Sequence, residues 1–476
     1  FMIYYVHIFI LYIYLSSLKF DLLQIDIHPY RYSIVYPLKM ALFSNKMHGL
    51  YINFFIIVCV IIKAFFVLNC FGQSNNFNNN NNNNRINKST SFDNKNNDNR
   101  NRLATCVANS HYECGKQIGK QQAARIQKTL QTKHAQTIFQ YVNQTVDGNK
   151  LYIFYLKLHL RVFPNLVDEI NGTSIGAKVD FQALFALNIE FELIAKGNLS
   201  TNGFRKGCSD YHLFQPNQGI NYWGHNEDGD INDKENGFYF VSSTINNQSY
   251  FAFSYSGRLP GWAWGFNNAI IQTINGLYVN PSTKPGLGIN FIARDLLNSH
   301  SMENAIERAN RDGQDGGSHF NIGSISMKQQ LSIETSWEGT TVQYLNGMNR
   351  NWYAHFNAYL HTDKPPFGDY TSSIHRMARV STIATRSNEL ELKDIGHILD
   401  VLGDKTTKPY CLNRCNTRED PYITFCTLTI DLENSKVRVY TDRTSKENID
   451  NYWVEFDDVD TINISRIKSF LPRFPY

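Results

Sequence analysis

The spacing of apolar residues changes at Cys208, and this change constrains the fold more than any other feature of the chain. Between Cys114 and Ile194 the apolar residues recur at helical spacing, and Asn-Gly or Gly-Asn pairs separate the segments. After Cys208, short runs of aromatic and β-branched residues alternate with turn sequences, which indicates β-hairpins. Helices combined with antiparallel hairpins predict an α+β sandwich.

The expected elements follow from these two patterns. Helices are predicted over 114–142, 151–162, 164–170, 181–194, 289–297, 302–309 and 390–402. Strands are predicted over 211–214, 220–223, 238–245, 250–255, 270–274, 319–325, 331–335, 341–345, 422–430 and 436–440. The segment before Cys208 is therefore mostly helical, and most strands follow it.

The N-terminal region does not resemble a globular domain. Residues 1–72 are predicted to be an apolar leader, with the natural start at Met40 or Met47. Its apolar run, 52–71, is long enough to cross a bilayer but contains Lys63, so a cleaved signal peptide and a signal anchor both remain open. Residues 73–104 are rich in asparagine and are predicted to form a disordered linker. The remaining two parts of the chain, 105–207 and 208–476, are predicted to build one domain.

Composition excludes several classes of function. The net charge is +4 over 476 residues, and no basic stripe with interleaved aromatics is present, which argues against nucleic-acid binding. Cys411 and Cys415 have no matching Cys or His pair, so a zinc site is not expected, but a disulfide among Cys411, Cys415 and Cys426 remains open. Six Asn-x-Ser/Thr sequons, together with the leader, favour a secretory route and a secreted or membrane-anchored protein. A cytoplasmic location is the alternative.

The residues around Cys208 do not by themselves identify a nucleophile. A lone Cys at the start of a strand is most often a small buried hydrophobe. His212 lies four residues further on, which places it roughly 13 Å away along a strand. From these residues alone, Cys208 is a weak candidate.

A series of short blocks between about 113 and 440 gives further information. The blocks are Tyr112-Glu113-Cys114-Gly115, Gly207-Cys208-Ser209, Gly224-His225-Asn226-Glu227-Asp228, Gly265-Phe266-Asn267, Gly286-Leu287-Gly288, Ile333-Glu334 and Cys426-Thr427-Leu428. In this order and spacing the chain resembles the peptidase C45 family of N-terminal nucleophile hydrolases, which includes the penicillin-forming acyltransferases. The blocks at Cys208 and His225 resemble the animal branch that hydrolyses β-alanyl amines.

The resemblance implies a four-layer αββα fold made as a precursor that cuts itself before a nucleophilic Cys. Carried over, the cut falls between Gly207 and Cys208, and the two chains stay associated. The freed amine of Cys208, whose pKa is about 8, then accepts the thiol proton, so no separate His base is needed. The resemblance implies no metal and no cofactor.

The resemblance also assigns site residues. Asp228 matches the acid that orients the Cys amine, Asn275 and Asn321 match oxyanion donors, and Arg376 matches an Arg beside the nucleophile. His225 stands where bile-salt hydrolases have an Arg.

Purely structural interpretations also remain open for these residues. Asn275 also fits an Asn-Gly turn, and Arg376 also fits a surface helix. Arg258 and Trp262 lie in a loop that would form the wall of the substrate pocket or a packed aromatic turn.

Three functions are compatible with these observations. The first is hydrolysis of a small N-acyl amine of the N-β-alanyl type through a thioester at Cys208. The second is acyl transfer to an amine on the same scaffold. The third is an inactive secreted glycoprotein that keeps the fold.

Overall fold

The structure is a computed structural model that describes residues 21–27, 30–36, 102–199, 207–231, 234–277, 284–362, 370–390, 394–441, 452, 454–456 and 468–469. The chain divides into two compact units, Phe1–Ser89 and Thr90–Tyr476. In the first unit, β1 (Asp21–Ile27) and β2 (Tyr30–Tyr36) form an antiparallel hairpin with Asp21 opposite Tyr36. The rest of the predicted leader, including 52–71, lies outside the described residues. Among the described helices, none combines the length and the apolar character that crossing a membrane requires.

The second unit contains an eight-stranded sheet. Its order is β12 (Gly339–Tyr344), β11 (Gln329–Ser336), β10 (Gly317–Ser324), β9 (Ile270–Leu277), β8 (Trp264–Asn267), β7 (Gln248–Tyr255), β6 (Phe238–Ile245) and β3 (Leu103–Ala108). All neighbours are antiparallel except β3, which pairs in parallel with β6. Seven strands therefore come from the chain after Cys208, and the edge strand β3 comes from the segment before it.

A seven-stranded sheet packs against the first. Its order is β13 (Trp352–His355), β4 (Cys208–Gln215), β5 (Ile220–Asp230), β14 (Tyr422–Asp431), β15 (Lys436–Tyr440), β16 (Val454–Phe456) and β17 (Lys468–Ser469), with antiparallel pairs throughout. A 3₁₀ turn, η1 (Pro216–Gln218), joins β4 to β5. Cys208 is the first residue of β4, so it lies at the end of a central hairpin of this sheet.

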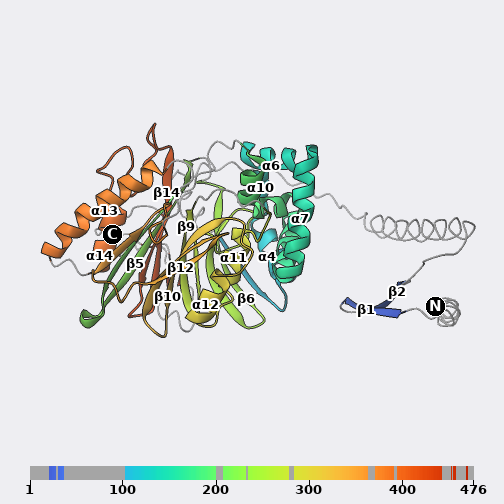
Figure 1. Ribbon diagram of the computed structural model, residues 1–476, viewed down its shortest axis with the longest axis horizontal. Helices are drawn as coiled ribbons and strands as arrows, with labels where there is room; N and C mark the ends of the chain where they lie inside the picture. Colours follow the sequence, from blue (N-terminus) through green and yellow to red (C-terminus); the bar gives the residue numbers. More distant parts are fainter. Residues whose placement is uncertain are drawn as a thin grey trace, which may run out of the picture. The chain divides into compact units, whose positions relative to one another are not determined.

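Helices cover the outer face of each sheet, which gives four layers (Figure 1). On the eight-stranded sheet lie α4 (His111–Gln121), α5 (Ala123–Leu130), α6 (Lys133–Gln144), α7 (Val146–Val162), α8 (Pro164–Ala177), α9 (Phe181–Asn188), α10 (Glu190–Gly197), α11 (Ile289–Leu296) and α12 (Met302–Ala309). On the seven-stranded sheet lie α13 (Thr371–Leu390) and α14 (Ile395–Leu402). The predicted α+β fold with αββα layers is confirmed.

The helical segment before Cys208 is tied closely to the rest of the domain. Glycines on α4 and α8 let the two backbones touch: a Cβ on Gly115 would lie 2.1 Å from the Glu169 carbonyl oxygen, and one on Gly172 would lie 2.0 Å from that of Tyr112. A disulfide between Cys106 and Cys114 links β3 to α4.

The cysteine predictions need correction. The disulfide at Cys106 was not predicted, whereas Cys411, Cys415 and Cys426 are free, with the Cys411 and Cys415 sulfurs 2.8 Å apart.

The boundaries of several elements differ from the predictions. The helix expected over 114–142 is three helices, with breaks at Gln122 and at 131–132, and that over 181–194 is two, with a break at Ile189. The linker boundary expected at 104/105 falls inside β3. The sequence patterns did not predict β1, β2, β3, β8, β13, β16, β17 or α13.

Candidate active site

The register of the β4–β5 hairpin places a set of polar side chains on one face. Cys208 pairs with Glu227, Asp210 with His225, and His212 with Trp223. Because residues two apart on a strand share a face, all six side chains point to the same side of this sheet, toward β9 and β11 of the other sheet. All six side chains are buried. Together they form a layer, called the polar layer below, that begins at Cys208.

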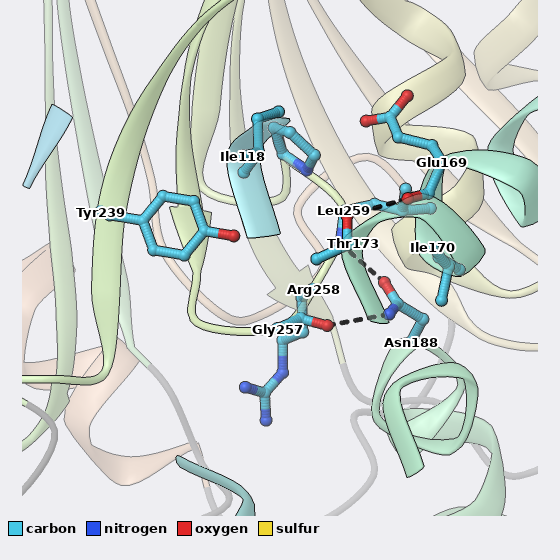
Figure 2. Close-up of a pocket in the computed structure, with 10 residues that line it drawn as sticks. Ile118, Glu169, Ile170, Thr173, Asn188, Tyr239, Gly257, Arg258 and Leu259 are labelled. Carbon is cyan, nitrogen blue, oxygen red and sulfur yellow. Dashed lines mark hydrogen bonds between the residues drawn. The ribbon is translucent and has the colours of Figure 1, made fainter. Parts of the chain in front are cut away.

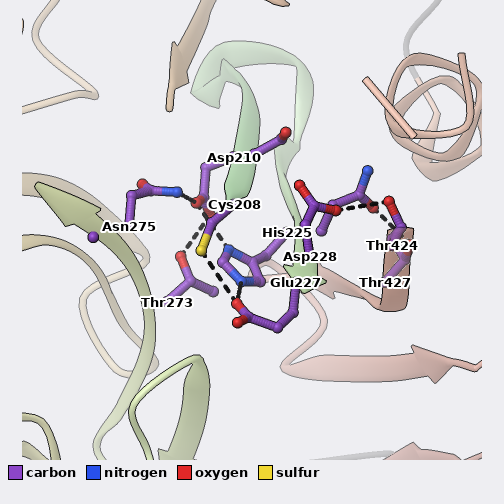
Figure 3. A network of polar contacts seen from close by, with 12 residues as sticks. Cys208, Asp210, His225, Glu227, Asp228, Thr273, Asn275, Thr424 and Thr427 are labelled. Atoms are coloured by element: carbon purple, nitrogen blue, oxygen red, sulfur yellow. Dashed lines mark hydrogen bonds and ion pairs between the residues drawn. The ribbon is translucent and has the colours of Figure 1, made fainter. Parts of the chain in front are cut away.

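The Cys208 thiol contacts a carboxylate. Its Sγ lies 3.2 Å from Glu227 Oε2, and His225 Nε2 lies 3.2 Å from the same oxygen (Figure 3). The other Glu227 oxygen accepts a hydrogen bond from the Tyr255 hydroxyl. Burial raises the pKa of Cys208 well above its usual value, and the negative charges of Glu227 and Asp228 add to this effect.

Asp210 holds the polar layer together. Its two carboxylate oxygens accept hydrogen bonds from Trp223 Nε1 (2.9 Å), Thr273 Oγ1 (2.5 Å) and Asn275 Nδ2 (2.7 Å), and His225 Nδ1 lies 2.9 Å away. Burial alone would raise the pKa of Asp210, but the neighbouring His225 outweighs it and lowers the pKa to about 2.

His225 lies between two carboxylates, Asp210 on Nδ1 and Glu227 on Nε2. Burial disfavours its charged form, yet these two acids outweigh burial and raise the pKa of His225 to about 10. His225 is therefore an imidazolium at neutral pH, with both ring nitrogens donating. It supplies a positive charge at the position where the sequence comparison expected an Arg.

The backbone around the Gly207–Cys208 bond is held at three atoms. The Cys208 N–H donates to Asn357 Oδ1 (3.2 Å), the Asp228 N–H donates to the Gly207 carbonyl (2.9 Å), and Arg376 Nη1 donates to the Cys208 carbonyl (2.6 Å). Arg376 is buried on α13, and its Nη2 also donates to Asn357 Oδ1 (2.9 Å). The predicted residue Arg376 therefore lies beside Cys208, and the structure excludes the surface-helix alternative.

Asp228 lies on the opposite face of β5 from the thiol, next to the Gly207 backbone. Its Oδ1 accepts from Thr424 Oγ1 (2.7 Å), and its Oδ2 lies 3.9 Å from Arg414 Nη1. Burial raises the pKa of Asp228 to about 7, because Arg414 and Arg376 offset it only in part. A Cβ on Gly207 would lie 2.5 Å from Arg414 Nη1, which explains why a glycine precedes Cys208.

The two predicted oxyanion residues, Asn275 and Asn321, differ in the number of contacts that separate them from the Cys208 thiol. Asn275 lies within β9 rather than in a turn, and its side chain joins Asp210 to His319, whose Nδ1 lies 2.7 Å from Asn275 Oδ1. Asn321 on β10 donates to Thr273 Oγ1 (3.2 Å). The structure thus connects Asn275 to the thiol through Asp210, His225 and Glu227, and it places Asn321 one contact further away.

Arg258 and Trp262 pack against the helical layer. Arg258 Nε donates to Glu190 Oε1 (2.6 Å), and Arg258 lines a small cavity between α8, α9 and the loop after β7 (Figure 2). Trp262 packs on Phe191, with ring centroids 4.9 Å apart, and also faces Gly276. Of the predicted site residues, Arg258 alone lines this cavity, and its guanidinium contacts Glu190 and the Ser256 carbonyl.

One group of described residues could reach a metal ion. Ligand atoms of Cys208, His225 and Glu227 lie within 4.8 Å of one another. The Cys208 thiol and the His225 ring both contact Glu227 Oε2.

Comparison with known proteins shows what the chain is similar to. Residues 214–446 match the model of the acyl-coenzyme A:6-aminopenicillanic acid acyl-transferase family. A beta-alanyl-dopamine/carcinine hydrolase of Drosophila melanogaster is 24% identical over 373 residues, which covers 71% of this chain and 92% of the relative. The predicted family resemblance is confirmed.

Two solved structures show weaker likeness to the chain. A Caenorhabditis elegans N-acylethanolamine-hydrolyzing acid amidase ortholog is 17% identical and covers 48% of this chain and 93% of its own, with a TM-score of 0.35. A conjugated bile acid hydrolase from Clostridium perfringens is 13% identical and covers 55% and 96%, with a TM-score of 0.34. At these scores the fold assignment rests on the layers described above. The curated relative and both of these proteins are hydrolases by name.

Five residues of the site were not predicted from the sequence. They are Asp210, Glu227, Tyr255, Asn357 and Arg414. For Asp210 and Glu227 a signal existed, because a hairpin joined at 216–219 pairs Cys208 with Glu227 and puts Asp210 two residues from Cys208. The other three come from distant parts of the chain, and their positions depend on tertiary packing.

Proposed function

We propose that this chain is a self-cleaving cysteine amidohydrolase that acts on small N-acyl amines of the N-β-alanyl type through a thioester at Cys208. One observation carries the proposal. The bond before Cys208 is held by Asn357, Asp228 and Arg376 at its three neighbouring polar backbone atoms, while the thiol of the same residue is buried beside it. Such fixed geometry favours an intramolecular attack.

The proposed reaction of the mature enzyme uses the new N-terminus. Once Gly207–Cys208 is cut, the amine of Cys208, with a pKa of about 8, accepts the thiol proton. The thiolate attacks the substrate carbonyl, the amine product leaves with a proton, and water hydrolyses the thioester. Arg376 and His225 supply the positive charges that favour thiolate and developing oxyanion. The curated Drosophila relative acts on beta-alanyl-dopamine and carcinine by name, which supports this substrate class.

The proposal is tested on the chain from residue 73 onward. Wild-type protein is expected to give two bands on a denaturing gel, and N-terminal sequencing of the larger chain is expected to begin Cys208-Ser209. Cys208→Ala is expected to stay uncut and inactive toward N-β-alanyldopamine. A wild-type chain that stays whole, or a Cys208→Ala chain that is cut equally, would overturn the proposal and favour an inactive glycoprotein.

Acyl transfer is the second candidate, because the matching family model is an acyl-transferase. The two activities differ only in whether water or an amine takes the acyl group from Cys208. Incubation with an acyl-coenzyme A and an amine acceptor separates them: an N-acylated product faster than hydrolysis favours the transferase.

A secretory location is proposed for the same protein. The Cys106–Cys114 disulfide is of the kind that forms and persists in oxidising compartments, which supports this location. Glycosidase treatment of the protein made in animal cells tests it: a mobility shift is expected, and an unglycosylated cytoplasmic product would contradict it.

A further inference from the structure

Self-cleavage poses a chemical problem that the mature mechanism does not solve. The amine that serves as base in the mature enzyme is a peptide nitrogen in the precursor. It is bonded to Gly207, and its N–H donates a hydrogen bond to Asn357. A peptide nitrogen cannot accept the thiol proton. The first turnover therefore needs another base, and burial makes the need greater because it raises the pKa of the Cys208 thiol.

The contacts of the thiol leave one candidate. Glu227 Oε2 lies 3.2 Å from Cys208 Sγ, whereas Asp228 lies on the other face of β5. His225 is excluded as a base because both of its ring nitrogens face carboxylates and donate hydrogen bonds to them. Among the described residues, Glu227 is thus the group with an acceptor atom directed at the sulfur.

We infer that Glu227 is the general base of self-cleavage, a catalytic residue for the precursor that is distinct from the amine base of the mature enzyme. This inference rests on the proposed function, because it assumes that Cys208 attacks Gly207.

The surroundings of Glu227 fit this task. The Tyr255 hydroxyl donates to Oε1 and His225 Nε2 lies 3.2 Å from Oε2, so both oxygens are fixed in direction. Asp210 fixes His225 in turn, at 2.9 Å. The two donors fix the direction of the carboxylate, which still presents an oxygen lone pair to the thiol.

The proposed step moves the thiol proton to the Cys208 nitrogen by way of Glu227. Glu227 takes the proton from Cys208 Sγ, and the sulfur attacks the Gly207 carbonyl carbon, closing a five-membered ring. The oxyanion forms on the Gly207 oxygen, which already accepts from the Asp228 N–H (2.9 Å). The C–N bond breaks, the proton held by Glu227 passes to the Cys208 nitrogen, and a thioester remains. Water hydrolyses this thioester to the Gly207 carboxylate and the free thiol.

The test follows cleavage of the full chain after cell-free synthesis, by pulse-chase and denaturing gel between pH 6 and 9. Wild-type cleavage is expected to vary little over this range, because Glu227 and not bulk solvent takes the thiol proton. Glu227→Gln is expected to cut about 100-fold more slowly at pH 7, since general base catalysis contributes on the order of 10²–10⁴-fold. The cleavage rate of this variant is also expected to rise about tenfold per pH unit, because the thiol must then lose its proton to bulk solvent.

Two further variants separate chemistry from folding. Glu227→Asp keeps a carboxylate and is expected to cut slowly with the flat pH profile of wild type. Glu307→Gln makes the same substitution at an exposed position of α12 and is expected to match wild type. Thermal unfolding of uncut Glu227→Gln, compared with Cys208→Ala, reports whether the precursor is folded.

Two results for Glu227→Gln would count against Glu227 as the base. Glu227→Gln that cuts within about threefold of wild type, or that cuts slowly with a flat pH profile, overturns the role of Glu227. Either result leaves the proposed function intact as long as wild type is cut and Cys208→Ala is not. The proposed function itself fails only if Cys208→Ala is also cut or wild type is not.

Discussion

At the scale of single residues, the site depends on one buried acid that does not touch the thiol. Asp210 accepts hydrogen bonds from Trp223, Thr273 and Asn275 and pairs with His225, and it is fully buried. These contacts join the two sheets at the depth of Cys208. Asp210 is therefore a positioning residue, and its loss acts through His225.

Removing this charge is expected to destabilise the whole domain. Asp210→Asn leaves the His225 imidazolium buried without its main counter-ion, and breaking a buried pair costs about 3–5 kcal/mol. Urea unfolding of the uncut Cys208→Ala protein, with and without Asp210→Asn, measures the free energy of unfolding. Asp312→Asn on an exposed turn is the matched control and is expected to change it by less than about 0.5 kcal/mol. A loss below about 1 kcal/mol for Asp210→Asn would contradict the central role of this acid.

His225 makes stability depend on pH with a definite sign. Its pKa is raised to about 10 in the folded state by Asp210 and Glu227, against an ordinary value of about 6.5. The stabilisation by the charged ring is therefore fully present below about pH 6.5 and is lost as pH rises toward 10.

The corresponding measurement is chemical denaturation of the Cys208→Ala protein at pH 7 and pH 9.5. Its free energy of unfolding is expected to fall between the two, and His225→Gln is expected to remove much of this fall. His300→Gln at an exposed position serves as the control. An unchanged pH dependence in His225→Gln would show that the ring is not charged in the folded protein.

At the scale of elements, α13 brings a cation to the nucleophile from about 170 positions along the chain. Arg376 donates to the Cys208 carbonyl, to Ser209 Oγ (2.9 Å) and to Asn357 Oδ1. These contacts use both ends of the planar guanidinium, which a lysine cannot reproduce.

Arg376→Lys is therefore expected to preserve folding but to slow both self-cleavage and amide hydrolysis about 10- to 100-fold. Pulse-chase cleavage and the turnover of N-β-alanyldopamine measure the two rates. Arg379→Lys, one turn away on the same helix and paired with Asp404, is the control and is expected to change neither rate appreciably. Equal effects of the two substitutions would place Arg376 outside the site.

The same helix shows where prediction from sequence reaches its limit. The hairpin β4–β5 could be predicted because aromatic runs flank a Pro-Asn-Gln-Gly turn. By contrast, the buried face of α13 includes Ser373 and Arg376 beside Val380 and Ala384, so no apolar stripe marks it. Strands β8 and β13 have four residues each, too few to show alternation. Arg376 could be proposed only from the family resemblance.

At the scale of the whole molecule, the missed site residues share one physical reason. Asp210 meets Thr273 and Asn275 because the two sheets stack, and Asn357 meets Cys208 because β13 pairs with β4. Contacts between residues 63 to 149 positions apart leave no local pattern in the sequence. Alternation along one strand could have shown Glu227 and Asp210, but only the packed sheets show what they contact.

The segments before and after Cys208 also share their buried charges. Glu169 of α8 pairs with Arg294 of α11 (2.9 Å), and Lys196 of α10 pairs with Asp315 (2.7 Å). Glu190 of α10 pairs with Arg258, and β3 completes the eight-stranded sheet. A cut at Gly207 therefore separates the covalent chain but leaves these contacts in place, so we expect the two products to co-elute as one species under native conditions.

Arg258 tests this expectation directly. Arg258→Ala breaks the buried pair between the two chains and leaves Glu190 with His134 (2.7 Å), so we expect a cost of at most about 3–5 kcal/mol, seen as earlier separation of the two chains on heating. Size-exclusion chromatography after stepwise heating, followed by a denaturing gel, measures that temperature, while the KM for N-β-alanyldopamine is expected to stay near wild type. Arg379→Ala, at a partly exposed pair with Asp404 inside the segment after Cys208, is the control. A raised KM with unchanged chain association would instead place Arg258 at the substrate, as its position in the sequence first indicated.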